Sequence, residues 1–239
     1  MINPLLTRLN AFIDLDGEDR AAVDQLCRAP RSFRAGQDVI KEGARPEFVQ
    51  LLLEGWACRY KVLPDGSRQI LAYLIPGDLC DMHVFILKRM DHSIGLLSDA
   101  KVVSIAKEQM LALTEQRPAV ARALWWSTLV DEAILRQWLA NVGQKGAYER
   151  LAHLFCEMWQ RMHQVGLTSE GEFTLPLTQE ELGDTVGLTS VHTNRMLQQM
   201  RSEGLITLSK GQLTIHDGNR MRQVAGFDAN YLHLERRLT

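Results

Sequence analysis

The chain has 239 residues, of which 46% are hydrophobic and 23% are charged, and its formal net charge at pH 7 is -2. These values are ordinary for a soluble globular protein of one or two domains, and they exclude an integral membrane protein, because no apolar run approaches the roughly 18 residues of a spanning helix. The small net charge also excludes a general attraction to nucleic acid, so any affinity for DNA must come from a local basic patch.

The amino-terminal segment and the cysteines indicate a cytoplasmic protein without a cysteine-held metal. The start, MINPLLTRLNAF, lacks the long apolar region of a signal peptide. Cys27, Cys58, Cys80 and Cys156 occur without C-x-x-C spacing, which disfavours a zinc site or an iron-sulfur cluster. We expect most of them to be buried as small hydrophobic residues, although Cys80 could be reactive if it is exposed.

Short apolar segments separated by turn residues predict a small β-domain in the amino-terminal half. A helical pattern from Gly17 to Arg28 comes first. Strands are then predicted at 38–41, 48–53, 56–62, 69–75, 94–97 and 101–105. Closely spaced strands with glycine and proline between them are typical of an antiparallel β-barrel or jelly roll. A further short helix is predicted at 107–115.

A long helix is predicted from Pro118 to about Val142, and one stripe along it repeats at intervals of three and four residues. The stripe consists of Leu124, Thr128, Asp131, Leu135, Trp138 and Val142. This spacing predicts a coiled-coil seam, through which two copies of the chain would pair as a two-fold homodimer. The alternative is that the same stripe packs on the chain's own barrel.

An interruption of the helical pattern predicts a hinge. The pattern breaks at 141–146 (NVGQKG) and resumes from Tyr148 to His163. The predicted organisation is therefore an amino-terminal domain over 1–117, a dimerisation helix and hinge over 118–144, and a carboxy-terminal domain over 145–239.

Residues 177–206 predict two short helices joined by a tight turn. Thr178 is placed to cap the first helix, whose first turn contains two glutamates, and Gly187 suits its end. Thr189 or Ser190 then caps the second helix. Residues 205–215 follow as two strands around Lys210 and Gly211, which predicts a winged hairpin.

The second helix has the side chains expected of a helix that enters the major groove of DNA. No acidic residue lies between Thr189 and Arg201, whereas Arg, Asn and Gln can pair with base edges. The predicted apolar stripe is Val191, Met196, Leu197 and Met200. The predicted DNA-binding residues are Thr178, Thr189, Ser190, Val191, His192, Asn194, Arg195, Gln198, Arg201 and Lys210. The alternative is an ordinary helical hairpin with a solvated face.

Several motifs together resemble the Crp/Fnr superfamily of bacterial transcription regulators. They are VIKEG at 39–43, VQLLLEG at 49–55, PDGSRQILAYLIPGD at 64–78, YERLAHLF at 148–155 and the helix-turn-helix at 177–206. The resemblance implies an α+β fold with a cyclic-nucleotide-binding-like barrel as sensor, a dimerisation helix and a winged helix-turn-helix domain. The implied partners are near-palindromic double-stranded DNA, a second copy of the chain and RNA polymerase.

The sensor departs from the family's nucleotide-binding pattern. Members that bind cyclic AMP hold the ribose with a Glu and the phosphate with an Arg-Ser pair, and the corresponding positions are Met82, His92 and Ser93. Met and His are weak replacements for these anchors, so we expect no binding of cyclic AMP. Only Cys27 lies in the first fifty residues, so the iron-sulfur cluster of oxygen-sensing members is not expected either.

Two alternatives remain for the signal. His83 stands where haem-based members place a ligand, so haem or another small molecule could be sensed through His83, although a lone His is more often structural. Alternatively, the protein has no ligand and is controlled by its abundance or by a partner protein. In that case the apolar residues Met82, Val84, Phe85, Ile86 and Leu87 would simply fill the barrel.

Three further features complete the sequence prediction. In the recognition helix Arg195 keeps the family's Arg, but Val191 replaces a Glu, which predicts a different half-site.

Enzyme motifs such as a nucleophile elbow, a phosphate-binding glycine loop or H-E-x-x-H are missing from the sequence, so no catalysis is expected. The tail over 217–239 predicts either a short extra helix or an added phosphate contact.

Overall fold

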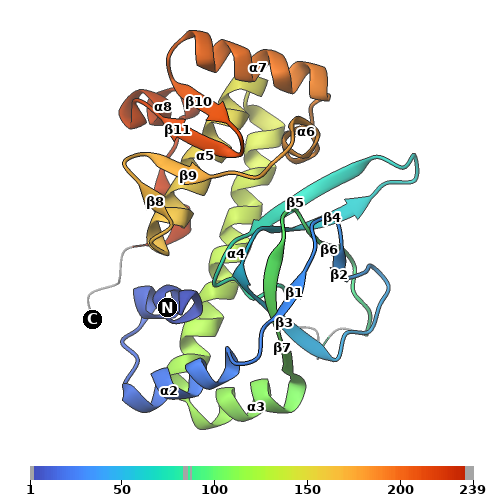
Figure 1. Ribbon diagram of the computed structural model, residues 1–239, viewed down its shortest axis with the longest axis vertical. Coiled ribbons are helices and arrows are strands. Elements are labelled where there is room, and N and C mark those ends of the chain that lie inside the picture. Colours follow the sequence, from blue (N-terminus) through green and yellow to red (C-terminus); the bar gives the residue numbers. More distant parts are fainter. Residues whose placement is uncertain (1–2, 83–85, 87, 235–239) are drawn as a thin grey trace.

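Two antiparallel sheets form the barrel of the amino-terminal half (Figure 1). The computed structural model describes residues 3–82, 86 and 88–234. One sheet has the strand order β1-β7-β3, formed by Arg31–Phe33, Ala100–Ala106 and Phe48–Glu54. The other has the order β2-β6-β4-β5, formed by Asp38–Ile40, Ser93–Leu96, Ala57–Val62 and Arg68–Leu74. Both sheets contribute to one buried cluster that includes Leu51, Ile94 and Val102, so the predicted antiparallel barrel is confirmed.

Short helices pack against the barrel, and the sequence prediction missed the first of them. α1 (Pro4–Phe12) begins at Asn3, whose side chain accepts hydrogen bonds from two backbone N–H groups of the first turn. α2 (Gly17–Leu26) and α3 (Lys107–Gln116) lie together at the bottom of Figure 1. Gly77 lets the barrel approach α1 closely, because it has φ +93° and a Cβ there would lie 2.7 Å from the carbonyl oxygen of Pro4.

The long helix α4 runs as one piece from Pro118 to Gln144 and connects the two halves of the molecule. Proline suits its first turn because the missing N–H has no partner there. No helix among the described residues is both long enough and apolar enough to cross a membrane.

The carboxy-terminal half is a winged helix-turn-helix domain. Its helices are α5 (Ala147–Gln164), α6 (Gln179–Val186), α7 (Ser190–Ser202) and α8 (Gly218–Ala225), followed by the 3-10 helix η1 (Ala229–Leu232). Its sheet has the order β10-β11-β9-β8, formed by Ile206–Ser209, Gln212–Ile215, Glu172–Thr174 and Thr168–Ser169. The α+β fold class is thereby confirmed, and the tail contains the short extra helix that was one of its two predicted forms.

Candidate functional site

The first helix of the helix-turn-helix is fixed by local hydrogen bonds at both ends. Thr178 Oγ1 accepts from the Glu181 backbone N–H at 3.1 Å, while the Glu181 carboxylate accepts from the Thr178 N–H at 2.8 Å. Gly187, in the left-handed region at φ 68°, ends α6. Gly183 is a position that the sequence prediction missed, since a Cβ there would lie 2.5 Å from the carbonyl oxygen of Leu188. The turn therefore needs glycine at two places.

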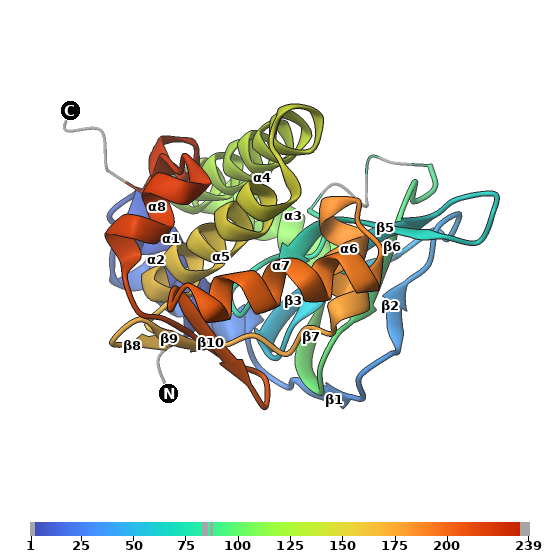
Figure 2. The same ribbon diagram turned by 90° about the horizontal axis from the view of Figure 1, so that it is seen from above.

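The second helix, α7, lies at the end of the molecule farthest from α2 and α3 (Figures 1 and 2). Its exposed residues include Arg195, Gln198 and Gln199. Thr189 Oγ1 accepts from the His192 N–H at 3.3 Å and so caps the helix. Thr193, Met196, Leu197 and Met200 are buried against the domain. Val191 is 79% exposed, so its predicted place in the apolar stripe is wrong, and buried Thr193 lies there instead.

The polar side chains of α7 are ordered by contacts with each other. Arg195 Nη2 lies 3.0 Å from His192 Nε2, which accepts a hydrogen bond from it. Gln179 in α6 donates to Asn194 Oδ1 at 3.3 Å. Arg195 and Gln198 are exposed. Arg195 thus supplies a positive group on this face, and its described contacts include no carboxylate.

The wing lies beside this face. Lys210 and Gly211 form its two-residue turn with φ angles of 50° and 74°, which is the left-handed geometry that such hairpins require. Lys210 is exposed. Arg201 donates to the carbonyl oxygen of Leu208 at 3.3 Å and so ties the end of α7 to the wing. Of the predicted DNA-binding residues, Thr178, Thr189 and Arg201 therefore also bind backbone groups of the domain through their side chains.

A cavity of about 350 Å³ lies between the barrel and α4. Its ionisable lining residues are Arg59, Asp81, Asp91, His92, Asp131 and Glu132. Arg59 is already engaged: it donates to the carbonyl oxygens of Cys80 and Leu79 at 3.0 and 3.3 Å and pairs with Asp131 at 3.0 Å. His92 Nδ1 lies 2.8 Å from Asp91, and this hydrogen bond lowers the pKa of the Asp91 carboxyl.

The four predicted effector residues are not all placed in this cavity. Met82 and His92 line it, whereas the Ser93 hydroxyl accepts from the backbone N–H of Glu42 at 2.9 Å. His83 lies outside the described residues, as do Val84, Phe85 and Leu87. Ile86 is 81% exposed, so the expectation that it fills the barrel is wrong. Burial raises the pKa of the Cys80 thiol to about 12, which keeps it protonated and unreactive.

The residues of the predicted dimer stripe on α4 differ in their burial. Leu124 is buried, Asp131 pairs with Arg59, and Trp138 packs on Tyr73 and donates to Glu157 at 2.9 Å. For these residues the structure matches the alternative, in which the stripe packs on its own chain. Leu135 and Val142 are exposed, and Thr128 is half-buried. The exposed apolar stripe of α4 consists of Trp125, Leu129, Leu135, Leu139 and Val142.

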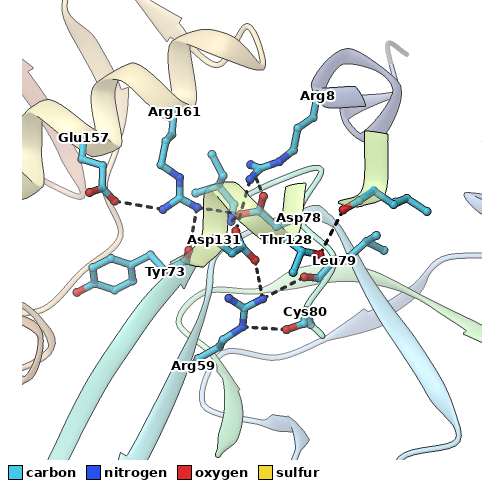
Figure 3. Close-up of polar contacts among 12 residues, drawn as sticks. Arg8, Arg59, Tyr73, Asp78, Leu79, Cys80, Thr128, Asp131, Glu157 and Arg161 are labelled. Atoms are coloured by element: carbon cyan, nitrogen blue, oxygen red, sulfur yellow. Dashed lines mark hydrogen bonds and ion pairs between the residues drawn. The ribbon is translucent and has the colours of Figure 1, made fainter. Parts of the chain in front are cut away.

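A buried polar cluster joins the two halves of the molecule, and the sequence prediction missed it. The interdomain cluster consists of Arg8 in α1, Asp78 after β5, and Glu157 and Arg161 in α5 (Figure 3). Asp78 pairs with Arg8 and, at 3.0 Å, with Arg161, whose guanidinium also donates to the carbonyl oxygen of Tyr73 at 2.9 Å. The only signal in the sequence is the spacing of Glu157 and Arg161, which places both on one face of a helix.

Burial shapes the charges in this cluster. The Asp78 and Arg161 side chains are each 4% exposed and that of Glu157 is 0% exposed. Desolvation raises the pKa of the Glu157 carboxyl, and the charge of Arg161 and the hydrogen bonds from Tyr231 and Trp138 oppose this rise. The cluster is a fully enclosed contact between the barrel, α1 and the winged domain.

Two domain families match separate parts of this chain. Residues 30–117 match the cyclic nucleotide-binding domain, and residues 149–224 match the Crp-like helix-turn-helix domain. The chain is 27% identical over 219 residues to the transcriptional activator protein FnrL of Cereibacter sphaeroides, covering 90% of this chain and 87% of that protein. It is 25% identical to the nitrogen fixation regulation protein FixK of Bradyrhizobium diazoefficiens, covering 81% and 80%. The structure of FixK2 from Bradyrhizobium japonicum superimposes with a TM-score of 0.73 at 26% identity, covering 84% of this chain and 98% of that one.

Proposed function

Because the chain belongs to the Crp/Fnr family of transcription regulators, we propose that it acts as a homodimer that binds a near-palindromic DNA site through α7 and the wing. The observation that carries this proposal is the exposed face of α7, which contains Arg, Asn and Gln but no acid and lies beside Lys210 of the wing. RNA polymerase is a further expected partner. Immunoprecipitation of the protein with its genomic DNA tests the proposal, and enrichment of one symmetric sequence motif is the expected result.

Within this site the side chains have different tasks. Arg195 is placed to grip guanine through O6 and N7, while Val191 can only contact a thymine methyl group. Ser190 at the start of α7 and Lys210 in the wing are suited to phosphates, which position the protein without reading sequence. His192, Asn194 and Gln198 supply further hydrogen-bonding groups beside Arg195. The proposed half-site therefore contains a guanine opposite Arg195.

We place the dimer interface on the exposed apolar stripe of α4. These five side chains are between 46% and 75% exposed in a single chain, with Leu139 the most exposed. They recur at intervals of three to six residues along one side of the helix, and two copies packed side by side would remove them from water. Leu135 and Val142 belong both to the stripe predicted from the sequence and to the exposed apolar stripe. Leu124 and Trp138 belong only to the predicted stripe.

A Leu139→Asp substitution is expected to weaken dimerisation at least about a hundredfold. The new carboxylate would be buried in the interface, opposite the same carboxylate of the second chain. Sedimentation equilibrium measures the dissociation constant. The matched control is Leu111→Asp, which introduces the same charge at a 42%-exposed position of α3. An equally tight dimer in both variants would place the interface elsewhere.

The cavity between the barrel and α4 is unsuited to a cyclic nucleotide. Four carboxylates line it. Its single arginine, Arg59, already donates to two backbone carbonyl groups and pairs with Asp131. A phosphate entering the cavity would meet these carboxylates, and the one arginine among the described lining residues is already engaged. The volume of about 350 Å³ nevertheless leaves room for a small molecule, which favours a ligand-dependent sensor over control by abundance or by a partner protein.

Titration of the protein with cyclic AMP is therefore expected to give no binding heat at millimolar nucleotide. The check is isothermal calorimetry, with DNA affinity measured in parallel with and without the nucleotide. Micromolar binding, or a DNA affinity that rises with cyclic AMP, would contradict the proposed role of the acidic lining. Native mass spectrometry of the purified protein then distinguishes a bound haem or other small molecule from an empty sensor.

A further inference from the structure

The last described segment of the chain crosses from the winged domain back to α4. This C-terminal strap, residues 227–233, includes η1 and follows α8 (red in Figure 1). It lies beyond residues 149–224, which match the helix-turn-helix domain model. The strap therefore lies outside the matched helix-turn-helix domain, and its contacts lie on both sides of the hinge.

On the winged-domain side, the strap packs its aromatic rings on one histidine of α5. Phe227 and Tyr231 contact His153 with ring centroids 5.0 and 5.8 Å apart. Burial lowers the pKa of His153 to about 4, so the imidazole is neutral at pH 7. Its Nε2 lies 3.1 Å from the Tyr231 hydroxyl, which in turn donates to Glu157 at 2.7 Å. The strap is therefore tied to the interdomain cluster through Glu157.

On the other side, the strap contacts the middle of α4. Leu232 is 1% exposed and belongs to the same buried cluster as Val130 and Ile134 of α4. The His233 ring lies 6.1 Å from Trp126 of α4, and Trp126 stacks on Phe12 of α1. These contacts would have to separate if the winged domain moved away from α4.

The hinge itself is short and is held at the same place. α4 ends at Gln144 and α5 begins at Ala147, so only Lys145 and Gly146 connect them. The Lys145 ammonium donates to the carbonyl oxygen of Ala225 at 2.7 Å and lies 2.9 Å from His153 Nδ1. Lys145 thus anchors the hinge to the end of α8, immediately before the strap begins.

We propose that the C-terminal strap is a latch that holds the winged domain against α4, and that its release lets the domain turn about Lys145 and Gly146. The strap bridges the hinge without belonging to either helix that the hinge joins. A movement of the recognition helix relative to the dimer stripe must therefore break the contacts of Leu232 and His233 with α4, whatever signal drives it. The latch depends on packing and requires no ligand of its own.

Limited trypsin digestion of the full-length protein tests the latch, because Lys145 is itself a cleavage site. In Leu232→Asp, cleavage after Lys145 is expected to be at least about tenfold faster than in the wild type, since a charge cannot occupy the buried position without opening the strap. The matched control is Asn230→Ala, which changes an exposed side chain of the same segment and should leave the rate unchanged.

A second variant separates latch opening from unfolding of the winged domain. Trp126→Leu removes the ring partner of His233 from α4 and leaves every residue of the winged domain in place. The expected result is faster cleavage after Lys145 with unchanged cleavage after Arg195 in α7. Wild-type rates at Lys145 in both Leu232→Asp and Trp126→Leu would overturn the proposal, as would a rise at Arg195 that equals the rise at Lys145.

Discussion

Asp78→Ala is expected to lower the free energy of unfolding by about 3–5 kcal/mol, because Arg8 and Arg161 would stay buried after losing the carboxylate that they share. Asp78 also accepts the backbone N–H of Ile75 at 2.9 Å, so the turn after β5 loses a local hydrogen bond as well. Chemical denaturation followed by circular dichroism gives the change. The effect is large because both buried cations share Asp78, whereas their other carboxylate partners lie farther away, Asp131 at 3.7 Å from Arg8 and Glu157 at 3.4 Å from Arg161.

The matched control for Asp78 is another carboxylate that pairs with a cation on the barrel. Glu54 accepts from Lys101 at 2.8 Å, but the two side chains are 49% and 44% exposed. Glu54→Ala should therefore cost less than about 1 kcal/mol. If Asp78→Ala were as mild as Glu54→Ala, the interdomain cluster would contribute no more to stability than a surface ion pair.

Arg195→Ala should weaken binding to the cognate site by about 2–6 kcal/mol per dimer, because each half-site loses a guanine contact worth about 1–3 kcal/mol. The loss should be confined to sequences with the guanine that Arg195 reads, so discrimination at that base pair should disappear. Gel shifts with the cognate site and with a site substituted at that pair provide the measurement. His192 is expected to change position too, since it loses its contact with Arg195.

Lys210→Ala provides the comparison for Arg195→Ala, since both remove one positive charge near the same face. A phosphate contact by Lys210 predicts uniformly weaker binding to cognate and substituted sites, together with a smaller dependence on salt. If the two variants lost affinity in the same pattern across sequences, Arg195 would be a phosphate contact rather than a base reader.

The helix-turn-helix could be predicted from the sequence because its determinants are local. Thr178 and Glu181 cap α6 three residues apart, Gly187 ends it, and Lys210 with Gly211 fixes the wing. Each of these signals depends only on residues that are close together in the sequence. The strands of the barrel were predictable for the same reason, since glycine and proline mark their ends.

The burial of the α4 residues and the interdomain cluster were harder to predict because they depend on distant parts of the chain. A period of three and four residues identifies an apolar face of α4, but does not indicate whether a barrel or a second copy covers it. Trp138 lies on the inner face because Tyr73 and Glu157 meet it there. Likewise, Arg8 is buried only because Gly77 lets α1 approach Asp78. α1 itself had a capping Asn and a first-turn Pro that favoured a helix.

Because α4 is unbroken, its number of residues also sets the rotation of the winged domain relative to the barrel about the helix axis. Each residue of an α-helix turns the chain by about 100° and advances it by about 1.5 Å. A single residue inserted between Leu129 and Leu139 would swing the recognition helix by more than a quarter turn about the helix axis, with its fold intact. Chimaeras that join this DNA reader to another barrel must therefore preserve the helical phase of α4 as well as its sequence.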